Sequence, residues 1–216
     1  MRIFLDTANV EQIRHGVRMG VVSGVTTNPT INAKEGNADY EALSKEICSS
    51  VSGPVSVEVL VEGVESMLRQ ARQIHSWAKN VVVKIPATAE GLEVTSLLSK
   101  EGIKVNMTLC FSLNQAILGA LAGAAYVSPF VGRLDDIGTD GIQRLKEIVE
   151  VLKCYQLRTE VIAASIRHPM HCVAAAMAGA HIATVPYNVL LQMIQHPMTT
   201  AGISRFLADW QKVTKK

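Results

Sequence analysis

The sequence predicts a single (β/α)8 barrel of the α/β class, and three observations support this prediction. The chain has 216 residues, which suits one such barrel. Short β-branched runs alternate with longer stretches of helical period, roughly eight pairs in all. Polar residues gather at the C-terminal ends of the short runs, where parallel barrels place their active sites. We therefore expect one domain over residues 1–216.

Eight segments are expected to form strands, because each is a short apolar run bounded by polar or turn residues. They are residues 3–6, 24–27, 55–60, 81–85, 104–109, 126–131, 160–165 and 182–186. The helices expected between and after them are residues 10–19, 40–50, 64–75, 91–100, 112–122, 140–155, 169–178 and 188–194. An additional amphipathic helix is expected over 203–213, within a C-terminal segment 201–216.

Capping residues agree with these helix limits. Thr7 or Asn9 is expected to open the first helix and Ser112 the fifth, because their side chains accept hydrogen bonds from the first helical amides. Three helices are expected to end at a glycine: Gly102, Gly123 and Gly179.

A doubly wound open sheet is the alternative fold, since it also alternates strands and helices. The number of pairs favours the barrel. No Gly-x-Gly-x-x-Gly motif follows the first strand, which weakens the dinucleotide-binding form of the open sheet.

Composition excludes several classes of partner. Charged residues make up 19% of the chain and the net charge is +2 without a basic block, so no nucleic-acid partner is expected. No apolar run approaches the roughly 20 residues that span a bilayer, so no membrane partner is expected. Asp6 interrupts any signal-peptide core, and Cys48, Cys110, Cys154 and Cys172 show no Cys-x-x-Cys spacing. We expect a cytoplasmic protein with reduced cysteines.

Lys84 is the most informative residue of the chain. It lies near the end of the apolar run Val81–Pro86, where a charge is costly unless it is paired or loses its proton. A neutral amine in a pocket is the nucleophile that attacks carbonyl carbons to form Schiff bases. Considered alone, a lysine that extends its ammonium into water from a strand end is the more common case.

Polar groups lie at the ends of seven of the eight expected strands, and they favour the catalytic interpretation of Lys84 over the solvent-exposed one. Side chains two residues apart on a strand share a face, so the paired ones point the same way. With Lys84, the set is Asp6, Thr26, Asn28, Glu58, Asn106, Thr108, Ser128, Arg133, Ser165 and Arg167, and Phe130 lies beside them.

Each of these residues has a simpler structural explanation when it is considered alone. Asp6 could cap the first helix, Asn28 could belong to a turn, and Arg133 could pair with Asp135 or Asp136 at the surface. A ring of polar groups that faces one barrel mouth without a role is much harder to accept.

The residues of this ring can also be assigned different chemical roles. Lys84 is its only amine, and Asp6 and Glu58 supply carboxylates for proton transfer. Phosphate sites of barrels often follow the seventh and eighth strands, and guanidinium groups bind phosphate in a bidentate manner. The anion-binding candidates there are Arg133, Ser165 and Arg167. From the residues alone we infer Schiff-base chemistry on a phosphorylated carbonyl compound.

A metal site is not expected. His168 and His171 have i, i+3 spacing at a helix start, but no carboxylate or cysteine completes a ligand set. A barrel lysine could also hold pyridoxal phosphate, which an absorbance scan would reveal.

Five motifs identify a resemblance that extends over essentially the whole chain. They are Gly24-Val25-Thr26-Thr27-Asn28-Pro29, Val83-Lys84-Ile85-Pro86, Asn106-Met107-Thr108-Leu109, Ser128-Pro129-Phe130-Val131-Gly132-Arg133 and Ala164-Ser165-Ile166-Arg167. With them, the chain resembles the small transaldolases, a subfamily that also contains the fructose-6-phosphate aldolases. The resemblance implies a (β/α)8 barrel that uses no metal and no organic cofactor.

The resemblance also implies a reaction. A three-carbon dihydroxyacetone unit would pass from sedoheptulose 7-phosphate or fructose 6-phosphate to glyceraldehyde 3-phosphate or erythrose 4-phosphate, in the non-oxidative pentose phosphate pathway. Lys84 would form the Schiff base, Asp6 would take the proton of the C4 hydroxyl, and Glu58 and Thr108 would hold a proton-shuttling water. The substrate-binding positions would be Asn28 and Asn106 for hydroxyls, Thr26, Ser128 and Phe130 as lining, and Arg133, Ser165 and Arg167 for phosphate.

Two positions distinguish members within the resembled subfamily. Its simple aldolases have Gln in place of Glu58 and Tyr in place of Phe130, so this chain has the transaldolase pattern. An aldolase that releases free dihydroxyacetone and a non-catalytic barrel that binds sugar phosphates remain the alternatives.

The subfamily further implies homo-oligomers, either pentamers or pairs of pentamers. The C-terminal helix, with Phe206, Leu207 and Trp210 on one face, would pack on a neighbouring subunit.

Overall fold

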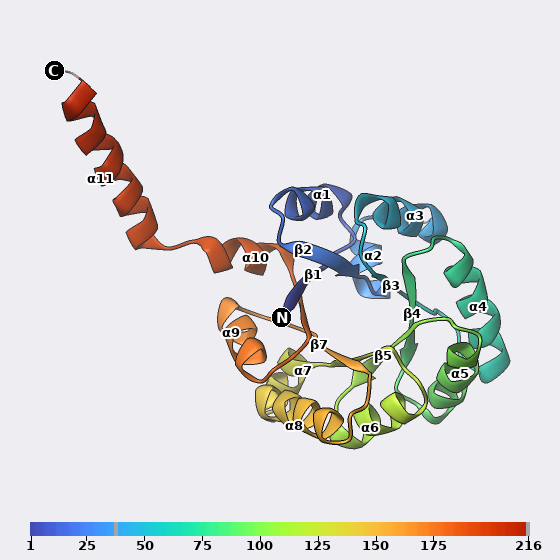
Figure 1. Ribbon diagram of the computed structural model, residues 1–216. Coiled ribbons are helices and arrows are strands. Elements are labelled where there is room, and N and C mark those ends of the chain that lie inside the picture. Colours follow the sequence, from blue (N-terminus) through green and yellow to red (C-terminus); the bar gives the residue numbers. More distant parts are fainter. Residues whose placement is uncertain (37–38, 215–216) are drawn as a thin grey trace.

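Eight parallel strands close into a barrel in the order of the chain, with helices around it (Figure 1). The computed structural model describes residues 1–36 and 39–214. The strands are β1 (Arg2–Asp6), β2 (Val22–Thr26), β3 (Val55–Glu58), β4 (Val81–Pro86), β5 (Val105–Cys110), β6 (Tyr126–Pro129), β7 (Glu160–Ala163) and β8 (Ile182–Val185). Strand β8 pairs with β1 and closes the ring. The predicted barrel is confirmed, and the open sheet is excluded.

The helices that the sequence predicts are present. They are α1 (Val10–Arg18), α3 (Tyr40–Ser50), α4 (Val64–Ser76), α5 (Ala89–Lys100), α6 (Leu113–Leu121), α8 (Gly141–Cys154), α9 (Pro169–Met177), α10 (Tyr187–Ile194) and α11 (Pro197–Thr214). Asn9 caps α1, and Ser112 forms a capping box with Gln115 at α6. The three predicted closing glycines, Gly102, Gly123 and Gly179, have positive φ angles.

Two short helices were not predicted, α2 (Pro29–Lys34) and α7 (Val131–Asp136). The prediction of strand up to residue 131 was wrong beyond Pro129, because Phe130 makes only an isolated bridge with Ala164 before α7 begins. The backbone of α7 lies close to the end of the next strand, since a Cβ on Gly132 would lie 2.2 Å from the Ser165 carbonyl oxygen. This close approach requires glycine at position 132.

Strands β3 and β7 each end two residues earlier than predicted, and the last helix begins earlier. Strand β7 ends at Ala163 rather than residue 165, because Ser165 has a φ of 60°, which is incompatible with a strand. Strand β3 ends at Glu58 rather than residue 60, and the Leu60 amide donates to the Gln70 side chain. Helix α11 begins at Pro197 rather than residue 203; residues 215–216 of the predicted C-terminal segment lie outside the described residues.

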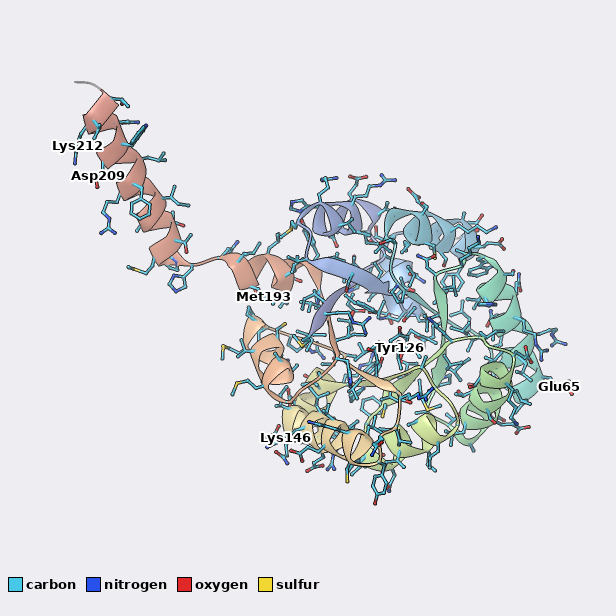
Figure 2. The ribbon with its side chains drawn as sticks, in the orientation of Figure 1. Glu65, Tyr126, Lys146, Met193, Asp209 and Lys212 are labelled. Atoms are coloured by element: carbon cyan, nitrogen blue, oxygen red, sulfur yellow. The ribbon has the colours of Figure 1, made fainter. Side chains whose placement is uncertain are left out.

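The interior of the barrel has an apolar floor that supports the functional residues. Its buried cluster consists of Phe4, Val82, Tyr126, Ile162 and Ile182. Figure 2 shows Tyr126 inside the ring, whereas Glu65 and Lys146 lie on the outer helices. Because side chains two residues apart share a strand face, the next inward positions lie one layer above this floor. These positions are Asp6, Lys84, Ser128, Ala164 and Thr184.

Helix α11 extends away from the barrel and buries none of its residues (Figure 1). It nevertheless carries exposed apolar side chains at positions that share one face: Ile203, Phe206, Leu207, Trp210 and Val213. Within residues 1–36 and 39–214, no helix combines the length and apolar character needed to cross a membrane.

Candidate active site

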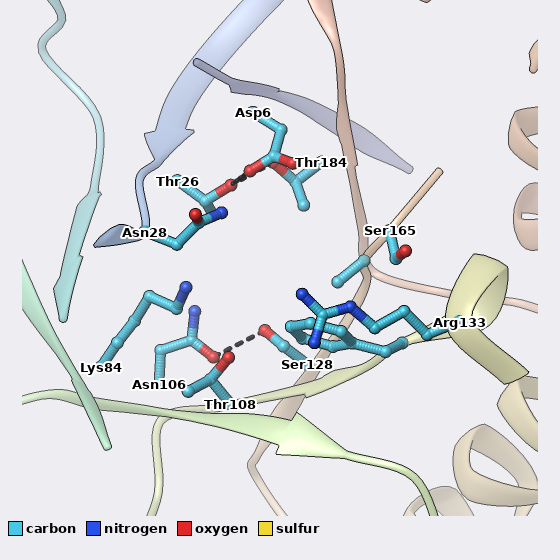
Figure 3. A pocket seen from close by; sticks show the side chains of 12 residues that line it. Asp6, Thr26, Asn28, Lys84, Asn106, Thr108, Ser128, Arg133, Ser165 and Thr184 are labelled. Atoms are coloured by element: carbon cyan, nitrogen blue, oxygen red, sulfur yellow. Dashed lines mark hydrogen bonds between the residues drawn. The ribbon is translucent and has the colours of Figure 1, made fainter. Parts of the chain in front are cut away.

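The barrel mouth contains a cavity that gathers most of the residues predicted from the sequence. Figure 3 shows Lys84 and Arg133 approaching it from opposite sides. Its lining is Asp6, Thr26, Asn28, Lys84, Asn106, Thr108, Ser128, Phe130, Arg133, Ala164, Ser165 and Thr184. Glu58 borders an adjoining cavity that shares Asn28, Thr108, Phe130 and Arg133. Arg167 does not line either cavity.

Lys84 is buried and paired. Only 5% of the residue is exposed, and its Nζ lies 3.0 Å from Glu58 Oε2 and donates to the Thr27 carbonyl oxygen at 2.9 Å. The register of the sheet places Glu58 directly opposite Lys84 on β3 and β4. The alternative that Lys84 extends its amine into water therefore does not apply. An amine and a carboxylate are therefore held together on two adjacent strands.

Tyr40 holds the end of β3 in place, although the sequence gave no indication of this role. Its hydroxyl donates to the Glu58 carbonyl oxygen at 2.8 Å and accepts from the Glu58 amide at 3.0 Å. Burial raises the pKa of the Tyr40 phenol, so that it keeps its proton. Tyr40 thus satisfies both backbone groups of Glu58 where the pairing of β2 with β3 has ended.

Asp6 faces the cavity from β1 and accepts a hydrogen bond from a side chain of the neighbouring strand β2. Thr26 Oγ1 donates to Asp6 Oδ1 at 2.8 Å. Asp6 does not cap the first helix, because Asn9 does so. Burial raises the pKa of Asp6 above its usual value, while the Thr26 bond and the Lys84 charge oppose this rise.

Side chains of β5 and β6 form a second polar group in the cavity. Asn106 donates to Ser56 Oγ at 3.1 Å and accepts from Ser128 Oγ at 2.7 Å. Thr108 Oγ1 is buried and has no hydrogen-bond partner within the described part of the chain. Because a buried hydroxyl without a partner is costly, Thr108 is suited to bind a water molecule or a substrate group.

Arg133 lies over the Phe130 ring, with its Cζ 5.1 Å from the ring centroid. Its alternative partners are engaged elsewhere: Asp135 lies 3.1 Å from His171 Nε2, and Asp136 binds Arg167 at 2.6 Å. Arg133 therefore presents its guanidinium to the cavity, whereas Arg167 is paired with Asp136 at the end of α7.

One polar lining residue, Thr184, was not predicted as functional. It is the only polar residue of β8 and is 2% exposed. The signal was present, because a lone threonine two residues from Ile182 shares its inward face. No group of three His, Cys, Asp or Glu side chains in residues 1–36 and 39–214 could hold a metal ion.

A parallel barrel with a buried lysine and two carboxylates at its mouth has the layout of the (β/α)8 barrel enzymes. Comparison with known proteins identifies the family within this class. The sequence matches the family described as transaldolase/fructose-6-phosphate aldolase over residues 3–216. The chain belongs to this family, and we accordingly describe it as an enzyme of the transaldolase and aldolase type.

Several relatives are similar over their full length. The chain is 64% identical to a probable transaldolase of Dehalococcoides mccartyi, with 100% of both chains covered. It is 54% identical to a probable transaldolase of Methanococcus maripaludis, with 98% of both covered. A solved structure, a putative fructose-1,6-biphosphate aldolase from Coccidioides immitis, matches with a TM-score of 0.57 at 15% identity, covering 86% of this chain and 73% of that one. This last likeness concerns the fold alone.

Proposed function

We propose that the protein is a transaldolase of the non-oxidative pentose phosphate pathway. It transfers a dihydroxyacetone unit from sedoheptulose 7-phosphate or fructose 6-phosphate to glyceraldehyde 3-phosphate or erythrose 4-phosphate. The observation that supports this most is the buried Lys84 amine, 3.0 Å from the Glu58 carboxylate, in a cavity that Asp6 faces from another strand. Its cysteines are free and three of them are buried, which suits the reducing cytoplasm.

The reaction begins when the neutral Lys84 amine attacks the C2 carbonyl of the ketose. Loss of water from the carbinolamine gives an iminium ion, and Glu58 and Thr108 hold the water molecule that moves the protons. The position of Glu58 beside Nζ and the unpartnered hydroxyl of Thr108 support these roles.

Carbon–carbon cleavage follows. The Asp6 carboxylate takes the proton of the C4 hydroxyl, the C3–C4 bond breaks, and its electron pair moves toward the iminium nitrogen. An aldose phosphate leaves, and a three-carbon enamine remains on Lys84. Attack of the enamine C3 on an acceptor aldehyde, return of the proton from Asp6 and hydrolysis of the iminium release the new ketose.

The remaining residues of the cavity orient the substrate. Asn28 and Asn106 bind hydroxyls of the dihydroxyacetone unit, and Thr26 and Ser128 line the site. Arg133 and Ser165 bind the phosphate from the opposite side of the cavity. Arg167 joins them only after it leaves Asp136, so phosphate competes with an exposed ion pair, which costs little to break.

The acceptor requirement tests this proposal. Release of glyceraldehyde 3-phosphate from fructose 6-phosphate is measured with and without erythrose 4-phosphate. Sustained release only with the acceptor is the expected result. Sustained release without acceptor, together with free dihydroxyacetone, identifies an aldolase instead, and no release in either case contradicts both activities.

Phe130→Tyr is expected to increase release of free dihydroxyacetone at the expense of transfer. Phe130 lines the cavity and packs edge-on against Phe111, with ring centroids 5.5 Å apart. A phenol hydroxyl there can orient a water molecule that protonates the enamine, whereas the phenyl ring cannot. We expect a change of roughly tenfold in the ratio of release to transfer, which is less than the 10²- to 10⁴-fold that a directly positioned general acid provides, because the phenol acts through a water molecule. Phe111→Tyr is the matched control; an unchanged ratio in Phe130→Tyr argues against this role.

We also propose that the protein forms a ring-shaped homo-oligomer, a pentamer or a pair of pentamers, in which α11 packs on a neighbouring subunit. The support is the exposed face of α11, where Phe206 and Trp210 are each 67% exposed. The double substitution Phe206→Glu and Trp210→Glu is expected to dissociate the oligomer, as measured by analytical ultracentrifugation. Helical periodicity places Lys212 away from Phe206 and Trp210, so Lys212→Ala is the control. A monomeric unmodified chain contradicts the proposal.

A further inference from the structure

A chain of hydrogen bonds crosses three adjacent strands at the barrel mouth. Thr184 on β8 lies with its Oγ1 2.5 Å from Thr26 Oγ1 on β2, and Thr26 donates to Asp6 on β1 at 2.8 Å. Both threonines are almost fully buried, with exposures of 2% and 3%. Figure 3 shows the three side chains grouped at one side of the cavity.

The direction of these bonds follows from the number of protons. An ionised carboxylate only accepts, and each threonine hydroxyl has one proton to donate. Thr26 therefore uses its one proton to donate to Asp6, and Thr184 must donate to Thr26. Within the described residues, Thr26 is the only hydrogen-bond partner of the Thr184 hydroxyl.

We propose that Thr184 is a positioning residue: its hydroxyl donates to Thr26 and thereby keeps the Thr26 hydroxyl directed as a donor at the Asp6 carboxylate. This inference deepens the proposed function and rests on its assignment of Asp6 as the base. Thr184 acts through Thr26 and does not need to touch the reacting atoms. A hydroxyl that accepts one hydrogen bond becomes a stronger donor in the next, so Thr184 favours the ionised form of Asp6.

The chain also accommodates the protonated form of Asp6. After Asp6 has taken a proton, it can donate to Thr26, and Thr26 can then donate to Thr184. Rotation of two hydroxyl groups is enough for this reversal, and each oxygen atom keeps its neighbour, although the Thr184 proton then has no acceptor within the described residues. Two β-branched side chains with restricted rotamers keep the oxygen atoms in place throughout.

Other charged groups also act on Asp6, and the test must leave them unchanged. Lys84 on β4 and Lys34 on α2 lower its pKa, and Glu58 on β3 raises it. Thr184 carries no charge, so its replacement by valine removes one hydrogen bond and keeps these three charges. Valine is also nearly isosteric with threonine and is compatible with a strand.

The experiment is a titration of Asp6 that does not depend on turnover. Carboxyl carbon NMR of protein labelled with ¹³C-aspartate is followed against pH, with the Asp6 signal assigned by its loss in Asp6→Asn. Thr184→Val is expected to raise the midpoint by about half a pH unit. Thr184→Ser, which restores the hydroxyl, is expected to return it to the wild-type value. The acidic limb of the kcat profile is expected to shift in the same direction, with KM unchanged.

A double substitution tests whether Thr184 acts through Thr26. In a Thr26→Val background, Thr184→Val is expected to cause no further shift of the midpoint. An unchanged midpoint in Thr184→Val alone, or an equal shift in both backgrounds, overturns the inference. A loss of activity at every pH without a shift of the midpoint overturns it too. Because the titration needs no turnover, failure of the proposed reaction is recognised separately, by an inactive wild type.

Discussion

Lys84→Met is expected to lower turnover by roughly 10⁴-fold or more while the barrel stays folded. The proposed reaction proceeds through a covalent bond to the Lys84 amine, and methionine has no amine to form it. Methionine fills a similar volume, and Lys84 is only 5% exposed, so packing around the position is retained. Turnover of fructose 6-phosphate with erythrose 4-phosphate measures the loss, and circular dichroism reports the fold.

Two controls separate covalent catalysis from electrostatics. Lys84→Arg keeps a positive charge beside Glu58 but cannot form a Schiff base under these conditions, so it is expected to be as inactive as Lys84→Met. Lys104→Met removes an exposed lysine just before β5 and is expected to keep full activity.

Reduction with borohydride in the presence of dihydroxyacetone should attach the three-carbon unit to Lys84 only. Attachment at another lysine, or turnover in Lys84→Met, refutes the assignment.

Most of the fold could be predicted because its strands are unusually clear in the sequence. Each is a short β-branched run, and the inward position above the barrel floor is polar in most of them, as Asp6, Lys84 and Ser128 illustrate. The helices that the sequence did not reveal are α2 and α7, which have only six residues each. Six residues span less than two turns, so hydrophobic periodicity cannot identify such helices.

The site could be predicted only in part, for a related reason. Sequence gives the strand position of a side chain but not its hydrogen-bond partner. Arg167 follows β7 at a position suited to phosphate, yet it pairs with Asp136 across a helix that the sequence did not reveal. Tyr40 supports Glu58 from the start of the preceding helix, 18 residues earlier in the chain, and no local pattern links the two residues. Such contacts depend on tertiary packing, which composition and spacing do not encode.

Asp6→Asn is expected to separate cleavage from Schiff-base formation. The amide keeps an oxygen that can accept from Thr26 but cannot take the proton of the C4 hydroxyl. Cleavage of fructose 6-phosphate is expected to fall by about 10²- to 10⁴-fold. Borohydride trapping of dihydroxyacetone on Lys84 is expected to remain, because it requires no cleavage. Glu58→Gln should show the opposite pattern, with slower trapping, and equal loss of both steps in Asp6→Asn contradicts the assignment.

The Asp6 carboxyl group makes both the cleavage rate and the stability of the wild-type protein depend on pH. Because burial raises the pKa of Asp6, wild-type cleavage is expected to decline as pH falls through this raised value, at a higher pH than an ordinary aspartate gives. Stability is expected to change in the opposite sense. As pH rises from the unfolded pKa to the raised folded pKa, the native state binds more protons than the unfolded chain and loses stability.

Asp6→Asn removes this loss, so at neutral pH the variant is expected to be more stable than the wild type in urea denaturation. In acid, where the carboxyl is protonated in both folded and unfolded chains, the difference is expected to vanish. A variant that is less stable than the wild type at neutral pH contradicts this expectation. A gain in stability together with a loss of cleavage would show that burial of Asp6 serves the reaction at the expense of the fold.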